Sequence, residues 1–129
     1  MSENYVYDSG ALIAIEDQRS PGRLERHRTR LLRSANILVP AVVAAQVVRN
    51  PARQARLMHA LVACELVPFD ARHHLPVGRL LAAAGTSDVV DAFVALTAAW
   101  ADAAVVTSDP ADIGQLLGAL GVDLAVLPP

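Results

Sequence analysis

Lysine is absent from this sequence of 129 residues, and its eleven strongly basic side chains are all arginines. The absence argues against two classes of protein that also place acids at strand ends. Receivers and phosphatases that form an aspartyl phosphate normally need a lysine, and P-loop nucleotide-binding proteins need a glycine-rich turn that ends in Gly-Lys-Ser/Thr. We therefore set both classes aside.

Cysteine and long apolar runs are also scarce. Cys64 is the only cysteine, which excludes an internal disulfide and suits a reducing compartment. The apolar runs at 41–45 and 92–100 are far shorter than the roughly 18 residues that a membrane span needs. Residues 1–8 hold two acids and show no basic segment followed by an apolar one, so no secretory signal is visible. We expect a cytoplasmic protein without a membrane segment.

Aromatic side chains number only five, so the core must be aliphatic. Hydrophobic residues nevertheless make up 53% of the chain, well above the content of disordered proteins. A chain of this length can bury one core but not two. We expect a single folded domain over residues 1–129.

The charge is distributed unevenly along the chain. Residues 1–64 hold nine arginines and five acids, a balance of +4, whereas residues 65–129 hold two arginines and eight acids, a balance of −6. This asymmetry suits a protein with a basic surface for a polyanion and an acidic site for a cation. A surface decorated at random is the alternative.

Strand and helix patterns alternate along the whole chain. Short β-branched or aliphatic runs predict strands at 4–8, 36–40 and 64–70, a fourth strand with the turn that follows it at 104–110, and a fifth strand at 122–128. Helical patterns predict helices at 9–17, 20–35, 41–50, 51–63, 72–84, 87–103 and 111–120. This order indicates an α/β fold with a parallel sheet covered on both faces.

Four acids lie beside the ends of the predicted strands. Asp8 closes the first strand, Asp109 directly follows the fourth, and Asp88 with Asp91 open the helix that leads into the fourth. Ligands of an open parallel sheet bind beyond the carboxyl ends of its strands. A spacing of three places Asp88 and Asp91 on one side of a helix. We therefore expect these carboxylates to meet at the carboxyl edge of the sheet.

Helix capping is the alternative explanation for several of these acids. Asp109 precedes a proline and suits an N-cap, with Asp112 in the first turn beside the positive end of the helix dipole. Asp88 suits the same role in its own helix. Capping does not explain Asp91, which lies among apolar residues, or Asp8, which ends a strand expected at the centre of the sheet; an unpaired buried carboxylate costs several kcal/mol.

A cation would relieve the repulsion between such carboxylates, which would otherwise take up protons. Ligands that are all oxygens point to Mg²⁺ or Mn²⁺ in preference to zinc. Thr107 and Ser108 can position a carboxylate or a water, although a plain strand-end role is expected of Thr107. The histidines lack a paired zinc spacing with Cys64, and we expect all four at the surface: His27, His59, His73 and His74.

Four segments occur in order along the chain: YVYDSGALIAIE (5–16), VPAVVAAQVVR (39–49), TSDVVDAFVAL (86–96) and AAVVTSDPADI (103–113). Together they resemble the successive motifs of PIN-domain ribonucleases, in particular the VapC-type toxins. The resemblance implies a three-layer α/β/α domain with a central parallel sheet of about five strands. It also implies a metal-dependent endoribonuclease, whose acids fall here on Asp8, Asp91 and Asp109, with Asp112 sometimes contributing.

One position departs from that family pattern. Gln46 stands where the family often has a glutamate, in the helix after the second strand. Its amide oxygen can still coordinate a cation but carries no charge, and Asp88 would restore that charge from a neighbouring helix. The expected metal ligands are then Asp8, Asp91, Asp109, Asp88 and Asp112, with Gln46 assisting catalysis. The alternative is a PIN-like domain that cleaves weakly or not at all and binds RNA or a protein.

Arginines dominate the predicted helices between residues 20 and 63. Guanidinium groups bind phosphates through paired hydrogen bonds, so this region is a candidate RNA surface. The predicted contacts are Arg19, Arg23, Arg26, Arg49 and Arg53. A solvated helix face is the alternative. Because few aromatic rings are available to stack on bases, we expect recognition through RNA shape and backbone.

The resemblance implies partners as well. They are an RNA substrate, with tRNA as one candidate, and a cognate antitoxin whose acidic tail would contact the same arginines. The apolar side of the helix at 51–63 is typical of core packing, but so much aliphatic surface in a small domain also suits a homodimer. We therefore predict the toxin of a type II toxin–antitoxin pair, which hydrolyses RNA by in-line attack of a water activated at the metal.

Overall fold

The computed structural model describes residues 3–129. Five parallel strands form one sheet in the order β3-β2-β1-β4-β5. The central strand β1 pairs with β2 on one side and with β4 on the other, so the chain reverses its winding direction beside β1. The strands are β1 (Glu3–Tyr7), β2 (Ser34–Pro40), β3 (Glu65–Val67), β4 (Ala104–Val106) and β5 (Val126–Leu127).

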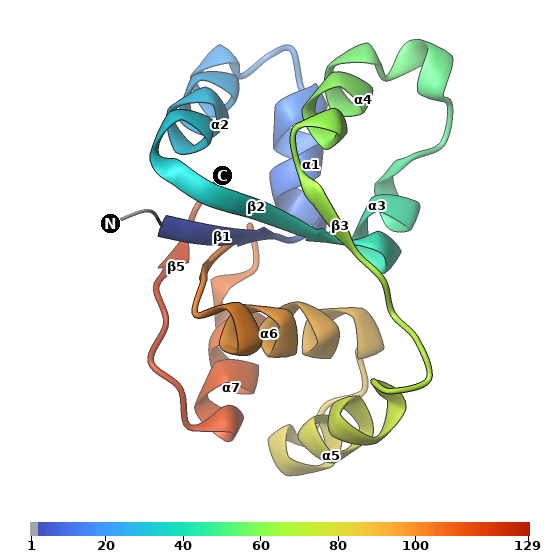
Figure 1. Cartoon of the computed structure of the whole chain (residues 1–129), viewed down its shortest axis with the longest axis vertical. Coiled ribbons are helices and arrows are strands. Elements are labelled where there is room, and N and C mark those ends of the chain that lie inside the picture. The colour runs from blue at the N-terminus through green and yellow to red at the C-terminus, as the bar shows by residue number, and fades with distance from the viewer. Residues whose placement is uncertain (1–2) are drawn as a thin grey trace.

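Helices cover both faces of the sheet, as Figure 1 shows. One face carries α1 (Ser9–Glu16), α2 (Pro21–Arg33), α3 (Ala41–Val47) and α4 (Ala55–Val62). The other face carries α5 (His74–Ala84), α6 (Val89–Ala101) and α7 (Pro110–Leu120). The predicted three-layer α/β/α fold with about five parallel strands is therefore confirmed.

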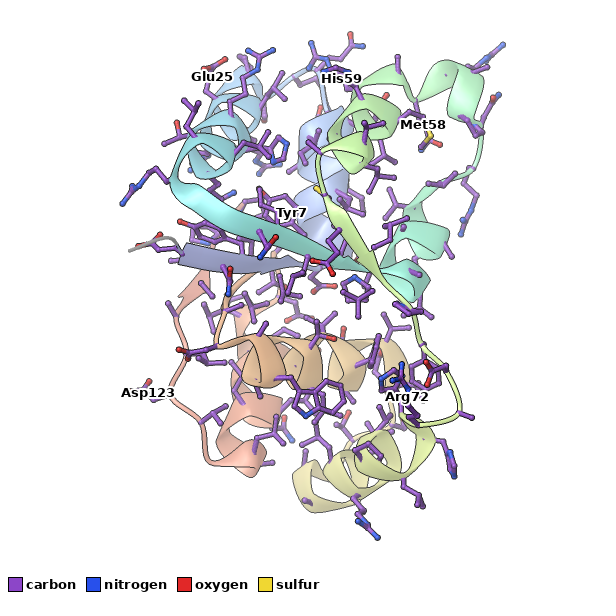
Figure 2. All side chains as sticks on the ribbon, viewed as in Figure 1. Tyr7, Glu25, Met58, His59, Arg72 and Asp123 are labelled. Carbon is purple, nitrogen blue, oxygen red and sulfur yellow. The ribbon has the colours of Figure 1, made fainter. Side chains whose placement is uncertain are left out.

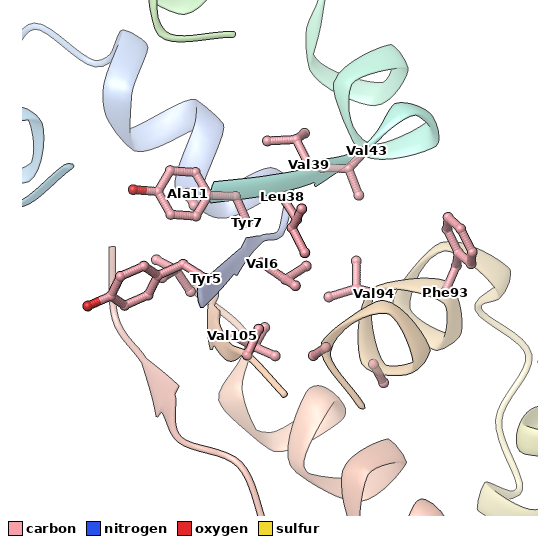
Figure 3. Close-up of a cluster of buried hydrophobic side chains, with 14 of the residues drawn as sticks. Tyr5, Val6, Tyr7, Ala11, Leu38, Val39, Val43, Phe93, Val94 and Val105 are labelled. Carbon is pink, nitrogen blue, oxygen red and sulfur yellow. The ribbon is translucent and has the colours of Figure 1, made fainter. Parts of the chain in front are cut away.

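The core is aliphatic and centred on β1. Alternation along this strand sends Val6 toward α6, where Val94 and Val105 lie nearby, while Tyr7 lies on the side of α1 (Figure 3). All seven residues from 92 to 98 are buried, because α6 is enclosed by the sheet on one side and by α5 and α7 on the other. A helix that is apolar almost all round belongs in such a position.

Several predicted elements extend beyond those of the structure, among them the strand at 64–70 and the strand with its turn at 104–110, and two others differ more strongly. The helix expected at 51–63 is split into a 3-10 turn, Pro51–Arg53, and α4. The side chain of Gln54 occupies the break: its oxygen accepts from the backbone N–H groups of Arg49 and Asn50, and its amide donates to the carbonyl of Val47. The last strand is limited to two residues, Val126–Leu127.

The prediction that all histidines lie at the surface is wrong for His27 and His73. His27 is 3% exposed, because it shares the inner side of α2 with Leu24 and Leu31, and its Nδ1 lies 2.7 Å from the Tyr7 hydroxyl oxygen. His73 is partly buried against an aromatic cluster, where its ring contacts those of Phe69, Phe93 and Trp100. The other two histidines are exposed as predicted.

Membrane-spanning length is not reached by any single helix within residues 3–129. Taken together, α5 and α6 have the length and apolar composition of a membrane span, but the chain bends by 105° between them.

Candidate active site

The change of winding direction brings the end of β1 next to the end of β4. Asp8 follows β1 directly, and its backbone N–H donates to the carbonyl of Val106 at 3.0 Å. This is the place where ligands of open α/β sheets bind. The segment after β4 continues through Thr107 and Ser108 to Asp109, so Asp8 and Asp109 start from adjacent strands at the same edge.

The carboxylate of Asp8 is buried and held from two sides. Its Oδ1 accepts from the backbone N–H of Ser9 at 2.6 Å, and its Oδ2 accepts from the Thr107 hydroxyl at 2.8 Å. The hydroxyl oxygen of Thr107 in turn accepts from the backbone N–H of Asp109 at 2.9 Å. The plain strand-end role expected of Thr107 is therefore wrong, since this side chain connects the two acid-bearing segments.

Gly10 allows α1 to approach the segment after β4. A Cβ atom placed on Gly10 would lie 1.7 Å from the Ser108 hydroxyl oxygen and 3.0 Å from the Ser108 backbone nitrogen. Any side chain at this position would force the two segments apart. The geometry around Asp8 thus depends on a residue without a side chain.

The helix α6 brings two further carboxylates. Asp88 is its N-cap, and Oδ1 of Asp88 accepts from the backbone N–H of Asp91 at 2.9 Å. Asp91 is half-buried in the first turn. The pKa of Asp91 is raised to about 6. Burial is the largest cause, and the negative charges of Asp88, Asp8, Asp109 and Asp112 follow it. Asp91 therefore lies within electrostatic reach of acids from three separate segments.

The start of α7 completes the set. Asp109 is the N-cap of α7 by position, with a proline after it, although its side chain makes no capping hydrogen bond. A hydrogen bond with the Asp109 carboxyl and the negative charges of Asp109 and Asp88 raise the pKa of Asp112. We call these five side chains the acid group: Asp8, Asp88, Asp91, Asp109 and Asp112.

A family model for the PIN domain matches residues 5–112. The chain belongs to the PIN domain family. Its fold is similar to that of a chain in the crystal structure of VapBC2 from Rickettsia felis bound to a DNA fragment from their promoter, with a TM-score of 0.74, 15% identity and 98% of each chain covered. It is also similar to PAE2754 from Pyrobaculum aerophilum, with a TM-score of 0.61, 16% identity, and 95% of this chain and 100% of the other covered. No curated protein sequence matches the chain.

The acid group of this PIN domain fits a divalent cation in its chemistry. Its donors are all carboxylate oxygens, which suit Mg²⁺ or Mn²⁺. Burial and four other acids shift the pKa of Asp91 upward, and no basic side chain is among the described residues that shift it. Within residues 3–129, however, no three His, Cys, Asp or Glu side chains come close enough together to enclose an ion in their present rotamers. The other four acids are electrostatic neighbours of Asp91, and within the described residues the five do not surround a common point.

Gln46 occupies a different place in the PIN domain. It is exposed on α3 and lines a hollow of about 400 Å³ together with Glu16, Asp17 and Arg19 from the end of α1. None of the hydrogen bonds described for residues 3–129 joins Gln46 to the acid group. The sequence predicted no role for Glu16. Its carboxylate accepts from the backbone N–H of Leu57 at 2.9 Å and so connects α1 to the first turn of α4.

The five arginines predicted to contact RNA fall into two sets. The guanidinium of Arg19 is paired with Asp17 at 3.0 Å, and that of Arg49 donates to the carbonyls of Ala45 and Val48 at the end of α3. The remaining three are exposed on α2 and the 3-10 turn: Arg23, Arg26 and Arg53. Within residues 3–129, no described side-chain contact would have to break before these three arginines could bind a ligand.

Proposed function

We propose that this PIN domain is a metal-dependent endoribonuclease that hydrolyses RNA phosphodiester bonds, and that it is the toxin of a type II toxin–antitoxin pair in the cytoplasm. The observation that carries the proposal is the acid group at the point where the sheet reverses its winding. Five carboxylates are held near one another there without a basic partner that stabilises Asp91, so a bound dication would relieve their repulsion.

Asp8, Asp91 and Asp109 would hold Mg²⁺ or Mn²⁺, with Asp88 and Asp112 beside them. Bound there, the ion would lower the pKa of water and offset negative charge on the phosphate. Ser9 and Thr107 keep both oxygens of Asp8 in a fixed orientation. The hydroxyl of Thr107 is buried and donates to Asp8, so it is committed to positioning and does not serve as a nucleophile.

RNA binding would use the exposed arginines on the opposite helical layer. Arg23, Arg26 and Arg53 are free of the intramolecular contacts that hold Arg19 and Arg49, so we assign them the main part in backbone binding. Their number favours contact with phosphates over reading of base edges. Transfer RNA is one candidate substrate.

The proposed protein partners are an antitoxin and a second copy of the chain. The Rickettsia felis neighbour comes from a structure of VapBC2 with promoter DNA, which supports a search for an antitoxin of this chain. Exposed apolar side chains such as Leu66, Val62 and Leu75 are consistent with a homodimer.

Cleavage of total RNA in the presence of Mn²⁺ tests the proposed activity. We expect the wild type to cleave and Asp8→Asn to cleave more than about a hundredfold more slowly, because even residues that only support a metal ligand affect activity 10–100-fold. Asp123→Asn is the matched control, since Asp123 is exposed and follows α7. Equal cleavage by the wild type and Asp8→Asn would overturn the assigned site.

A second candidate function is a PIN domain that binds RNA without efficient cleavage. The exposure of Gln46 on α3, apart from the hydrogen bonds of the acid group, favours this candidate because a neutral amide replaces the glutamate of the family pattern. The same RNA preparation separates the two. Retention of intact RNA by the wild type with Mn²⁺ present would support the binding module.

A further inference from the structure

A second polar site lies between α2 and α4, away from the elements that carry the acid group. It is a pocket of about 260 Å³, which we call the α2–α4 pocket. Figure 2 shows His59 on α4 at the end of the molecule where Glu25 marks α2, with Tyr7 of β1 beneath them. Two arginines, two histidines and four aliphatic residues line the pocket: Leu24, His27, Arg28, Leu31, Arg56, His59, Ala60 and Ala63. None of these lining residues is an acid.

His27 lines this pocket, and its tautomer decides what its buried Nε2 can offer to a ligand. Burial lowers the pKa of His27 to about 4 and raises the pKa of Tyr7 to about 12, so at neutral pH the imidazole is uncharged and the phenol keeps its proton. The Tyr7 phenol also meets the guanidinium of Arg30, which can only donate, so we assign the phenol oxygen as acceptor there and as donor to Nδ1 of His27 across their 2.7 Å contact. The remaining imidazole proton then resides on Nε2. Among the residues that the structure describes, this nitrogen is buried and has no hydrogen-bond partner.

Arg56 supplies a second donor. Its Nη1 is also buried and has no hydrogen-bond partner within residues 3–129, and a guanidinium stays charged at any physiological pH. Buried donors that lack an acceptor destabilise a fold, and most proteins avoid them. The ion pair of Arg28 with Glu25 leaves Arg28 partly compensated on α2. His27 and Arg56 are thus two unsatisfied donors, one neutral and one cationic, at the same pocket.

We propose that the α2–α4 pocket binds a carboxylate group. A carboxylate has one negative charge and two oxygens, which match one cationic and one neutral donor. The aliphatic walls suit the methylene groups that carry such a carboxylate. A phosphate matches the pocket less well, because the two further polar residues of the lining, Arg28 and His59, are exposed and Arg28 is already paired with Glu25. The site is independent of the proposed nuclease activity and needs neither metal nor RNA.

Nuclear magnetic resonance of the full-length chain without metal tests the proposal. The Nε2 signal of His27 would be followed during titration with butyrate, with acetyl-glutamate amide as a model of a protein side chain, and with inorganic phosphate. We expect saturable shifts with the carboxylates and little effect of phosphate. Tighter binding of butyrate would indicate a free carboxylic acid, and tighter binding of the glutamate derivative an acidic segment of a protein; both outcomes support a carboxylate site.

Two variants locate the binding. Arg56→Gln should weaken carboxylate binding about tenfold or more, the usual effect of losing a hydrogen bond to a charged group. Arg53→Gln is the matched control, because Arg53 is exposed on the neighbouring 3-10 turn and should leave the affinity unchanged. If Arg56→Gln does not fold, wild-type shifts at the Leu24, Leu31 and Ala60 methyl groups decide the location. Two results would overturn the proposal. One is the absence of a saturable shift, which is expected if the pocket holds only an ordered water. The other is a response to phosphate alone.

Discussion

In the part of the chain that the structure describes, the acid group lacks a positively charged partner, whereas the α2–α4 pocket lacks a negatively charged one. The acid group brings five carboxylates together with no basic side chain among the groups that shift the pKa of Asp91, whereas the pocket is lined by four basic residues and no acid. Burial favours the neutral form in both places, since it raises the pKa of Asp91 to about 6 and lowers that of His27 to about 4. The chain keeps its surplus acceptors apart from its surplus donors, so each site can be completed by a ligand of the opposite kind.

The two regions also differ in how they are built. The acid group draws on the ends of β1 and β4 and the starts of α6 and α7, which are fixed by the central sheet. The pocket lies between two helices of one outer layer, and one of its lining residues, His27, contacts Tyr7 of the central strand. Substitutions that test the comparison should therefore affect one region and spare the other.

The largest effect after loss of a metal ligand should come from Thr107→Val, which removes the hydroxyl that holds Asp8 while keeping the shape of the side chain. We expect RNA cleavage to fall about 10–100-fold through kcat, with KM little changed. Thr107→Ser should restore most of the activity. Thr97→Val is the matched control, because the buried hydroxyl of Thr97 donates only to the carbonyl of Phe93 within α6. Similar rates for both valine variants would contradict the positioning role.

Gly10→Ala should separate the acid-bearing segments, because the added Cβ collides with Ser108. We expect the free energy of unfolding in urea to fall by about 1–3 kcal/mol, as for other overpacked sites. Gly22→Ala is the matched control. It adds the same methyl group on α2, one of the two helices of the α2–α4 pocket, where no atom lies within 4 Å of the added Cβ. That variant should be neutral or gain up to about 1 kcal/mol. Equal stability of the two variants would show that the contact between α1 and Ser108 is loose.

Asp91→Asn should change how stability depends on pH. The folded-state pKa of about 6 lies above the ordinary value of 3.8 for an aspartate, so the ionised carboxyl destabilises the folded state. This penalty is absent below pH 3.8 and complete above about 6, so metal-free wild type should lose stability as the pH rises between these values. Asp91→Asn should lack that loss and be more stable at pH 7 by on the order of 1 kcal/mol, a value reduced because the carboxyl is half exposed. Parallel curves for both proteins in thermal unfolding would contradict this account.

The sequence predicted the sheet and the position of the acids from local signals. Alternating β-branched strands and helices indicated the parallel sheet, and the positive φ angles of Gly85 and Gly121 confirm the predicted ends of α5 and α7. Capping, the alternative explanation for Asp88 and Asp109, is found as a side-chain hydrogen bond for Asp88, whereas Asp109 holds the N-cap position without such a bond. These features depend on residues close together in the chain.

The contacts that the sequence did not predict join residues far apart in the chain. Thr107 reaches Asp8 across 99 positions, Glu16 reaches Leu57 across 41, and His27 reaches Tyr7 across 20. Local periodicity carries no information about such pairs. The pattern around His27 resembled a solvated arginine-rich helix, and only its place opposite Tyr7 reveals that the ring is buried.

Calorimetric titration with Mn²⁺ tests the central claim, that the acid group shares a divalent cation, most directly. The account predicts saturable binding by the wild type and by Asp123→Asn, with binding lost or at least about tenfold weaker in both Asp8→Asn and Asp91→Asn. Unchanged Mn²⁺ affinity in Asp8→Asn and Asp91→Asn would contradict it.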